Sequence, residues 1–155
     1  PGPIVTPEGR EVGRHQGLAY YTLGQRQGLG IGGARGAREA PWFVAAKDPA
    51  RNALVVVQGH GHPMLHASSI DAIDPHWIAG DAPSLPRRLA AKTRYRMADA
   101  ACSLTVRDNG LRAEFDAPQF APTPGQYLVL YDGEVCLGGG VIDRAQPAAA
   151  ESANP

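Results

Sequence analysis

The sequence predicts an all-β protein built from two small β domains, the second of them a closed β-barrel. The first reason is composition: 19 glycines and 14 prolines among 155 residues are too many for a helical protein. The second is a strict alternation of apolar and polar residues at 102–106 and 111–116. The third is a series of short apolar runs separated by turn residues, at the close spacing typical of small barrels.

The first domain is expected to cover residues 1–66 and to contain two hairpins. Residues 4–5 and 10–12 flank a proline turn, which is typical of a short hairpin. The apolar, partly β-branched runs at 42–46 and 53–58 are joined through an Asp-Pro turn and predict the second hairpin.

The connections of this domain are rich in glycine. Residues 17–25 are the best place for a short helix, although glycines bound the segment. Residues 28–36 are expected to form a loop, because interior glycines cost helices and strands roughly 0.5–1 kcal/mol each. The Gly/His/Pro-rich residues 58–67 are interpreted as a connection to the second domain.

The second domain is expected to cover residues 67–144 and to begin with a short strand within 68–78, before Pro75. The alternating runs around the Asp-Asn-Gly turn at 108–110 predict a hairpin with one buried and one solvated face. A further hairpin is predicted from the apolar run 127–131, with Asp-Gly turn chemistry of type I′.

The C-terminal end of the chain is expected to lack structure of its own. Residues 145–155 have few apolar groups to bury and are expected to form a disordered tail. The start, Pro-Gly-Pro, indicates a cut made inside a longer protein. No apolar run approaches the roughly 18 residues that a membrane span needs, so no membrane partner is expected.

Positive charge gathers in two windows that contain no acidic residue, although the formal net charge is zero. Residues 82–98 carry five cations and residues 13–38 carry four, together nine of the 15 in the chain. If the chain is extended there, Lys92, Arg94 and Arg96 share one strand face at a spacing of two. A phosphate backbone would relieve their repulsion. The alternative is a solvated basic face without a partner.

Motifs for catalysis or metal binding are incomplete. His60, His62 and His66 cluster, but no second ligand group lies at a characteristic spacing, so a surface loop is the simpler interpretation. Cys102 and Cys136 stand in apolar strand-like runs, which favours reduced, buried thiols over nucleophiles. The glycines of 28–33 do not have the spacing of a dinucleotide fingerprint.

Several segments, taken together and in order, resemble the bacterial tRNA-specific 2-thiouridylase family from about residue 9 to residue 142. They are Arg14-His15-Gln16-Gly17, the run Tyr21 to Gly33, Pro41-Trp42-Phe43-Val44 with Lys47-Asp48, Gln58-Gly59-His60 with His62-Pro63, Lys92-Thr93-Arg94-Tyr95-Arg96, Thr123-Pro124-Gly125-Gln126, and Gly133 to Gly140.

The resemblance implies a role in sulfur transfer to tRNA. Enzymes of this family use ATP to adenylate the C2 oxygen of the wobble uridine, U34, and a cysteine persulfide then attacks that carbon. The ATP-binding loop and the two catalytic cysteines belong to an N-terminal domain whose pattern is absent here. The chain resembles the central domain and the C-terminal, translation-factor-like barrel, so no catalytic residue and no cofactor is expected in it, and it should be inactive alone.

The resemblance also implies site residues. In the family, tRNA contacts come from the residues that match Arg94, Tyr95 and Gln126. Lys92 and Arg96 are added from the charge pattern alone. Simple alternation would point Tyr95 to the opposite strand face unless a bulge rotates it.

The sequence therefore predicts a cytoplasmic, tRNA-positioning part of a 2-thiouridylase, with tRNA and the catalytic N-terminal domain as partners. ATP and persulfide sulfur are expected only in the full-length enzyme. Two alternatives stay open: a protein-interaction module that recruits a sulfur carrier or mediates dimerisation, and a redox or metal enzyme that uses the cysteines and the histidine cluster.

Overall fold

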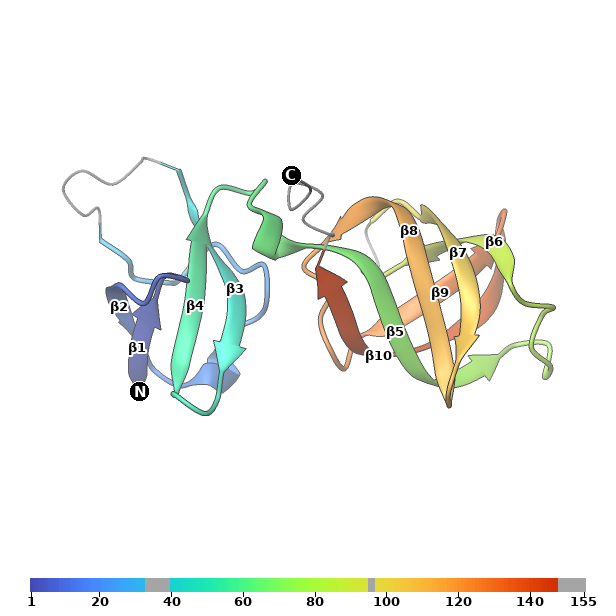
Figure 1. Ribbon diagram of the computed structural model, residues 1–155, viewed down its shortest axis with the longest axis horizontal. Helices are drawn as coiled ribbons and strands as arrows, with labels where there is room; N and C mark the ends of the chain where they lie inside the picture. Colours follow the sequence, from blue (N-terminus) through green and yellow to red (C-terminus); the bar gives the residue numbers. More distant parts are fainter. Residues whose placement is uncertain (33–39, 95–96, 148–155) are drawn as a thin grey trace, which may run out of the picture. The chain divides into compact units, whose positions relative to one another are not determined.

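The computed structural model describes residues 1–32, 40–94 and 97–147, and the chain divides into two compact units, residues 1–65 and 66–155 (Figure 1). The predicted all-β class is confirmed: across the described ranges the elements are ten strands and two 3₁₀ turns of three residues each. The division lies one residue from the expected one. No helix in these ranges is long and apolar enough to cross a membrane.

Unit 1 contains a four-stranded sheet in the order β2-β1-β4-β3. Its strands are β1 (Gly2–Val5), β2 (Glu11–His15), β3 (Trp42–Asp48) and β4 (Ala53–Gln58). β1 and β2 pair antiparallel, as do β3 and β4, so both predicted hairpins of this unit are confirmed. The two hairpins join where β1 and β4 run parallel.

The helix predicted within 17–25 is wrong except for a single 3₁₀ turn, η1 (Leu18–Tyr20). Gly17 precedes this turn and Gly24 follows it by four residues, and their positive φ angles of 144° and 84° do not fit a continuous helix. The glycine-rich segment instead runs along β3, where the Gly24 amide donates to the Val44 carbonyl (2.8 Å) and the Val44 amide donates to the Gln25 carbonyl (2.9 Å). Leu29 is buried against the same sheet.

Unit 2 is a closed barrel in the order β10-β5-β8-β7-β6-β9. Its strands are β5 (His66–Trp77), β6 (Arg87–Lys92), β7 (Ala100–Arg107), β8 (Gly110–Phe120), β9 (Tyr127–Asp132) and β10 (Val135–Pro147), and η2 (Pro63–Leu65) precedes them. All neighbouring strands pair antiparallel. The predicted closed barrel and both of its hairpins are therefore present.

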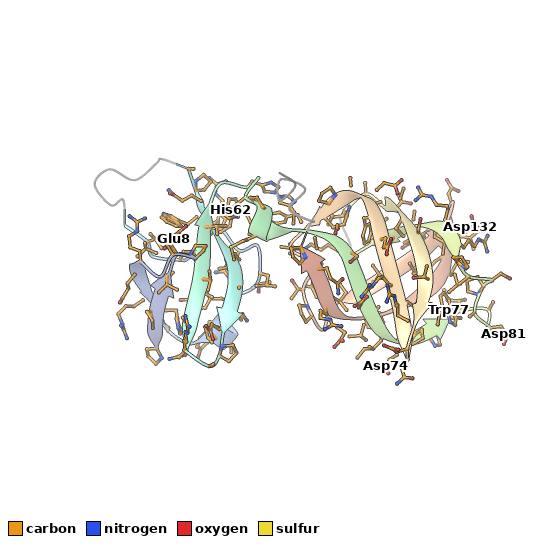
Figure 2. All side chains as sticks on the ribbon, in the orientation of Figure 1. Glu8, His62, Asp74, Trp77, Asp81 and Asp132 are labelled. Atoms are coloured by element: carbon orange, nitrogen blue, oxygen red, sulfur yellow. The ribbon has the colours of Figure 1, made fainter. Side chains whose placement is uncertain are left out.

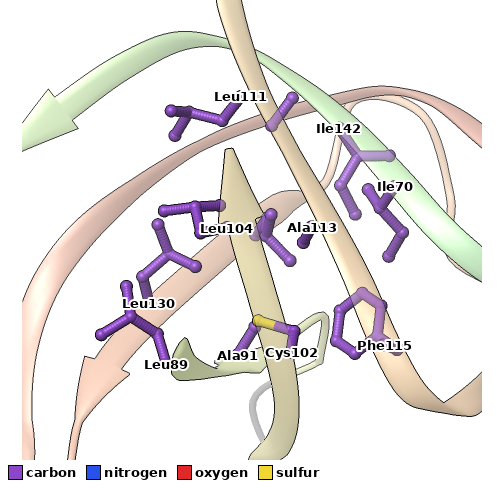
Figure 3. Packing of buried hydrophobic residues seen from close by; sticks show 12 residues of the cluster. Ile70, Leu89, Ala91, Cys102, Leu104, Leu111, Ala113, Phe115, Leu130 and Ile142 are labelled. Atoms are coloured by element: carbon purple, nitrogen blue, oxygen red, sulfur yellow. The ribbon is translucent and has the colours of Figure 1, made fainter. Parts of the chain in front are cut away.

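The barrel core is filled by the inward-facing apolar residues of these strands (Figure 3). Leu104, Leu130 and Ile142 are no more than 1% exposed and come from three different strands. Successive side chains of a strand point to opposite faces. The apolar residues at alternate positions of 102–104 and 111–115 therefore face the barrel core, and the polar residues between them face outward. Burial of apolar area of this kind is the main stabilising contribution to folding.

Three details of the barrel differ from the sequence-based expectations. β10 continues to Pro147, with Ala145 paired to Ile70, so the expected tail does not begin at 145; residues 148–155 lie outside the described part. β5 passes Pro75 by means of an irregular pairing register. The β9–β10 turn has positive φ only at Gly133 (60°), which fits type II′ and not type I′.

Three consecutive glycines, residues 138–140, lie where β10 contacts both of its neighbouring strands. A Cβ at Gly138 would come within 2.0 Å of the His76 carbonyl oxygen on β5, and one at Gly139 within 1.9 Å of the Leu128 carbonyl oxygen on β9. No side chain fits at such distances, so these glycines let β10 approach the strands on either side and close the barrel.

Candidate nucleic-acid interface

A pocket of about 400 Å³ opens on the barrel and contains three of the predicted RNA-binding residues. Its lining consists of Lys92, Thr93, Arg94, Gln126, Tyr127, Val129 and Tyr131. The predicted residues Lys92, Arg94 and Gln126 come from segments separated by more than thirty positions, and the structure brings them together. Tyr95 and Arg96, the other two predicted residues, lie outside the described ranges.

One wall of the pocket is the outer face of β9. Leu128 and Leu130 point into the barrel and are 0% exposed, so Tyr127, Val129 and Tyr131 face outward. These three lining residues were missed by the sequence analysis. The run looked continuously apolar because valine and the tyrosine rings on the outer face are also apolar.

Lys92 lies on the neighbouring strand, where β6 pairs with β9 and Lys92 is opposite Val129. Its ammonium nitrogen is 5.2 Å from the centre of the Tyr131 ring, a cation–π distance. None of the ion pairs in the described part of the chain involves Lys92. Its charge is therefore available to the pocket.

Arg94 does not lie on a strand face with Lys92, because β6 ends at Lys92 and the chain bends there. The expectation of alternating cations along an extended segment is therefore wrong for Arg94. Its guanidinium is positioned by the end of β8: Nη2 donates to the Ala121 carbonyl at 3.0 Å, and the guanidinium carbon is 5.9 Å from the centre of the Phe120 ring.

Gln126 is positioned by the turn that begins at Thr123. Gly125 has a φ of 91° and the Gln126 amide donates to the Thr123 carbonyl at 3.1 Å, the geometry of a type II turn with Pro124 at its first corner. The Ile142 amide donates to the Gln126 carbonyl at 2.7 Å and fixes the backbone. The side-chain Oε1 of Gln126 is buried and has no hydrogen-bond partner among the described residues.

The segment that carries Arg94 and the turn that carries Gln126 both hydrogen-bond to one backbone carbonyl, that of Ala121. The Thr123 hydroxyl donates to the Ala121 carbonyl at 3.1 Å, and this carbonyl also accepts from Arg94. Ala121 itself has a φ of 45°, a conformation that non-glycine residues seldom adopt. A single backbone group therefore sets the relative positions of Arg94 and the Gln126 turn.

Two other cations of the same window, Arg87 and Arg88, are paired with carboxylates. Arg87 forms an ion pair with Asp132, which is labelled in Figure 2. Arg88 donates to both carboxylate oxygens of Asp116, from Nη1 to Oδ1 at 2.6 Å and from Nη2 to Oδ2. The described part of the basic window is thus not one continuous charged edge.

A smaller pocket of about 210 Å³ lies on unit 1 and is lined in part by Glu8, Arg10, Trp42 and His62 (Figure 2). Hydrogen bonds from the backbone at Glu8 and from Thr6 lower the pKa of the Glu8 carboxyl. Its negative charge offsets the Arg10 cation, so this pocket is less suited to a phosphate group than the barrel pocket is.

The histidines are not gathered into one site. His60 packs edge-on against Phe43 and His66 packs edge-on against Phe120, each with ring centres 5.7 Å apart. His62 accepts a hydrogen bond from the Met64 amide through Nδ1 (3.1 Å). Among the described residues, no group of three His, Cys, Asp or Glu side chains could hold a metal ion.

The cysteines are both free thiols. Cys102 is 0% exposed in the barrel core (Figure 3), and burial raises the pKa of its thiol to about 11. A thiol with so high a pKa is protonated at neutral pH and is a poor nucleophile. The geometry of Cys102 therefore counts against the redox-enzyme alternative.

Comparisons with known proteins match both units. A family model described as a tRNA methyl transferase PRC-barrel domain matches residues 1–58, and one described as an aminomethyltransferase beta-barrel domain matches residues 67–142. A tRNA-specific 2-thiouridylase MnmA from Thiobacillus denitrificans is 64% identical over 143 residues, which are 92% of this chain and 40% of the relative. This chain belongs to the tRNA-specific 2-thiouridylase family.

Two further 2-thiouridylases show the same degree of likeness. The protein named MnmA from Chromohalobacter salexigens is 59% identical and covers 92% of the chain, and that from Pseudomonas fluorescens is 54% identical and covers all of it. The chain spans 37% and 41% of the lengths of these two relatives. The shared family thus accounts for both units, and the chain corresponds to about two fifths of the length of these relatives.

Proposed function

We propose that this chain is the tRNA-binding part of an enzyme that 2-thiolates the wobble uridine of tRNA. Two observations support the proposal: the relatives are named as tRNA-specific 2-thiouridylases, and Lys92, Arg94 and Gln126 converge on one pocket. The convergence carries the proposal, because a cation, a guanidinium and an amide beside exposed aromatic rings are the groups that proteins use to bind RNA.

In this proposal the chain holds substrate and another part of the protein performs the chemistry. ATP binding, adenylation of the uridine and delivery of persulfide sulfur are assigned to the catalytic N-terminal domain of the full-length enzyme in the cytoplasm. The buried Cys102 is not suited to carry a persulfide. The chain alone should bind tRNA and be inactive in thiolation.

The binding energy is expected to come largely from phosphate contacts. Among the described residues that line the pocket, Lys92 and Arg94 are the positively charged ones. Tyr95 and Arg96 remain predicted contacts. Each phosphate neutralised by a cation releases condensed counterions, so affinity falls as salt rises. A logarithmic plot of affinity against salt should therefore have a clear negative slope.

The test is fluorescence anisotropy of labelled tRNA with the whole chain at several salt concentrations. Lys92→Ala should weaken binding and reduce the size of the salt slope by about one. The matched control is Arg107→Ala. Ala100, at one end of β7, pairs with Ala91, the neighbour of Lys92. Arg107 is at the other end of β7, seven residues or about 23 Å along the strand from Ala100. The control should change the slope less.

An absence of tRNA binding, or binding without a salt slope, would contradict the proposal. Equal effects of Lys92→Ala and Arg107→Ala would show that binding is diffuse and does not depend on the pocket. Binding to a sulfur-carrier protein or self-association without RNA binding would favour the alternative of an interaction module.

A further inference from the structure

We propose that the outer face of β9 holds unpaired RNA bases on Tyr127 and Tyr131, so that the pocket distinguishes unpaired nucleotides from duplex. This inference rests on the proposed function, because it assumes that the chain binds RNA. It adds two contact residues and a class of ligand to the site. Four features of the pocket support it.

The first feature is the exposure and spacing of the aromatic rings. Tyr127 is 60% exposed although it lies on the barrel wall, and Tyr131 lines the same pocket. Two residues four positions apart on a strand lie about 13 Å from each other on one face. Val129 lies between them and gives the wall an apolar surface. Exposed rings on a strand face are the platforms on which proteins stack unpaired bases.

The second feature is the cation that lies over the face of one ring. The Lys92 ammonium nitrogen lies 5.2 Å from the Tyr131 ring centre. A nucleotide stacked in the pocket brings its phosphate within reach of this cation, while its base contacts the aromatic wall. Aromatic stacking combined with a positively charged groove is the usual mode of binding to single-stranded nucleic acid.

The third feature is the buried amide oxygen of Gln126. Because Oε1 has no partner among the described residues, a ligand that donates an N–H group to it would satisfy a buried acceptor. The Watson–Crick edge of an unpaired base carries such donors. In a duplex these donors are already bonded to the opposite strand, so paired bases do not offer them.

The fourth feature is size. A cavity of about 400 Å³ lies within the range of roughly 300–1,000 Å³ that takes small ligands. It is therefore large enough to admit the base and sugar of an unpaired nucleotide. A duplex would have to lie across the rim and could contact the cations there, but its bases could not stack on the tyrosine rings.

The test compares two labelled probes with the same number of phosphates, a single-stranded oligoribonucleotide and a blunt RNA duplex, by anisotropy with the whole chain. Tyr127→Ala should weaken binding of the single strand by roughly 5- to 150-fold and change duplex binding less than about twofold. Tyr127→Phe, which keeps the ring, should retain most of the affinity. The salt slope should not change, since no charge is removed.

Two further variants complete the test. Gln126→Met, which keeps the length of the side chain and removes its acceptor, should weaken binding of the single strand and spare the duplex. Tyr20→Ala removes a tyrosine that is 79% exposed on unit 1, and it should leave both affinities unchanged. Far-UV circular dichroism of each variant checks that it remains folded.

The outcomes separate the inference from the proposed function. If Tyr127→Ala weakens neither probe, or both equally, the inference is overturned, and the proposed function stands as long as Lys92→Ala still lowers tRNA affinity. If neither tRNA nor the oligonucleotides bind in a salt-dependent manner, the proposed function itself fails. Loss of single-strand binding in Tyr127→Ala with rescue in Tyr127→Phe supports the inference.

Discussion

At the scale of single residues, the most strongly perturbed of the described carboxyl groups is Asp71 on the barrel wall. Arg112 donates to its two oxygens from Nε (2.6 Å) and Nη2 (2.9 Å), and the Gln146 amide donates at 3.0 Å. The hydrogen bonds from Arg112 are the main reason that the pKa of Asp71 falls to about 2, with Gln146 and the charge of Arg144 adding to the effect. The network joins β5, β8 and β10.

The Asp71 network should make the stability of the barrel depend on pH. The folded-state pKa of about 2 is below the ordinary value of 3.8, so the stabilisation is present above pH 4 and is lost as the pH falls from about 4 to 2. Asp71→Asn should therefore lower the free energy of unfolding at pH 7 by on the order of 2 kcal/mol.

Urea unfolding of wild type and Asp71→Asn at pH 7 and at pH 2.5 checks this expectation. The difference between the two proteins should be much smaller at the acidic pH, since this carboxyl is then largely protonated in the unfolded wild-type chain and proton uptake favours unfolding. Asp143→Asn on the neighbouring surface is a suitable control, because Asp143 is exposed. A difference that is the same at both pH values would show that the ionisation of Asp71 does not stabilise the fold.

At the scale of elements, the glycines of β10 determine whether the barrel can close. Gly139 pairs with Val129 on β9 and with His76 on β5, so backbone lies on both of its sides. The nearest atoms to an added Cβ are backbone atoms, which cannot rotate away as a flexible side chain can. Accommodating one would force the strands apart.

Gly139→Ala should destabilise the protein by roughly 3 kcal/mol or more, measured by chemical denaturation. Gly140→Ala should cost less, because its added Cβ would lie 2.8 Å from the nearest atom and not 1.9 Å. Gly61→Ala, where no atom lies within 4 Å, should change stability by less than about 0.5 kcal/mol. A Gly139→Ala protein as stable as Gly61→Ala would show that close strand approach is not the reason for this glycine.

At the scale of the whole molecule, the two units have separate hydrophobic cores. The core of unit 1 is formed around Ile4, Leu54 and Val56, and that of unit 2 around Ile70, Leu104 and Leu130. No residue belongs to both clusters. A closed barrel also leaves no sheet edge that needs the other unit as a partner.

The barrel should therefore fold without unit 1. Residues 66–147 expressed alone are expected to give a β-type circular dichroism spectrum and a single cooperative unfolding transition. This transition should match one of the transitions of the whole chain. A barrel fragment that unfolds without cooperativity would show that unit 1 contributes to its stability.

The fold could be predicted largely from local signals. The hairpins follow from alternation and turn chemistry, which depend on neighbours in sequence. The expected helix at 17–25 failed because the segment's glycines take conformations that follow from its contact with β3. The positions of Arg94 and Tyr127 could not be read from periodicity, since the first depends on where β6 ends and the second on which face of β9 is buried.

By itself, the sequence determined the all-β class, the four hairpins and the family to which the chain belongs, because these follow from local alternation, turn chemistry and short motifs. Only the tertiary structure decided that Lys92, Arg94 and Gln126 share one pocket and that two tyrosines line its wall. The physical reason is barrel closure: β6 and β9 are far apart in sequence, and their pairing fixes which side chains meet.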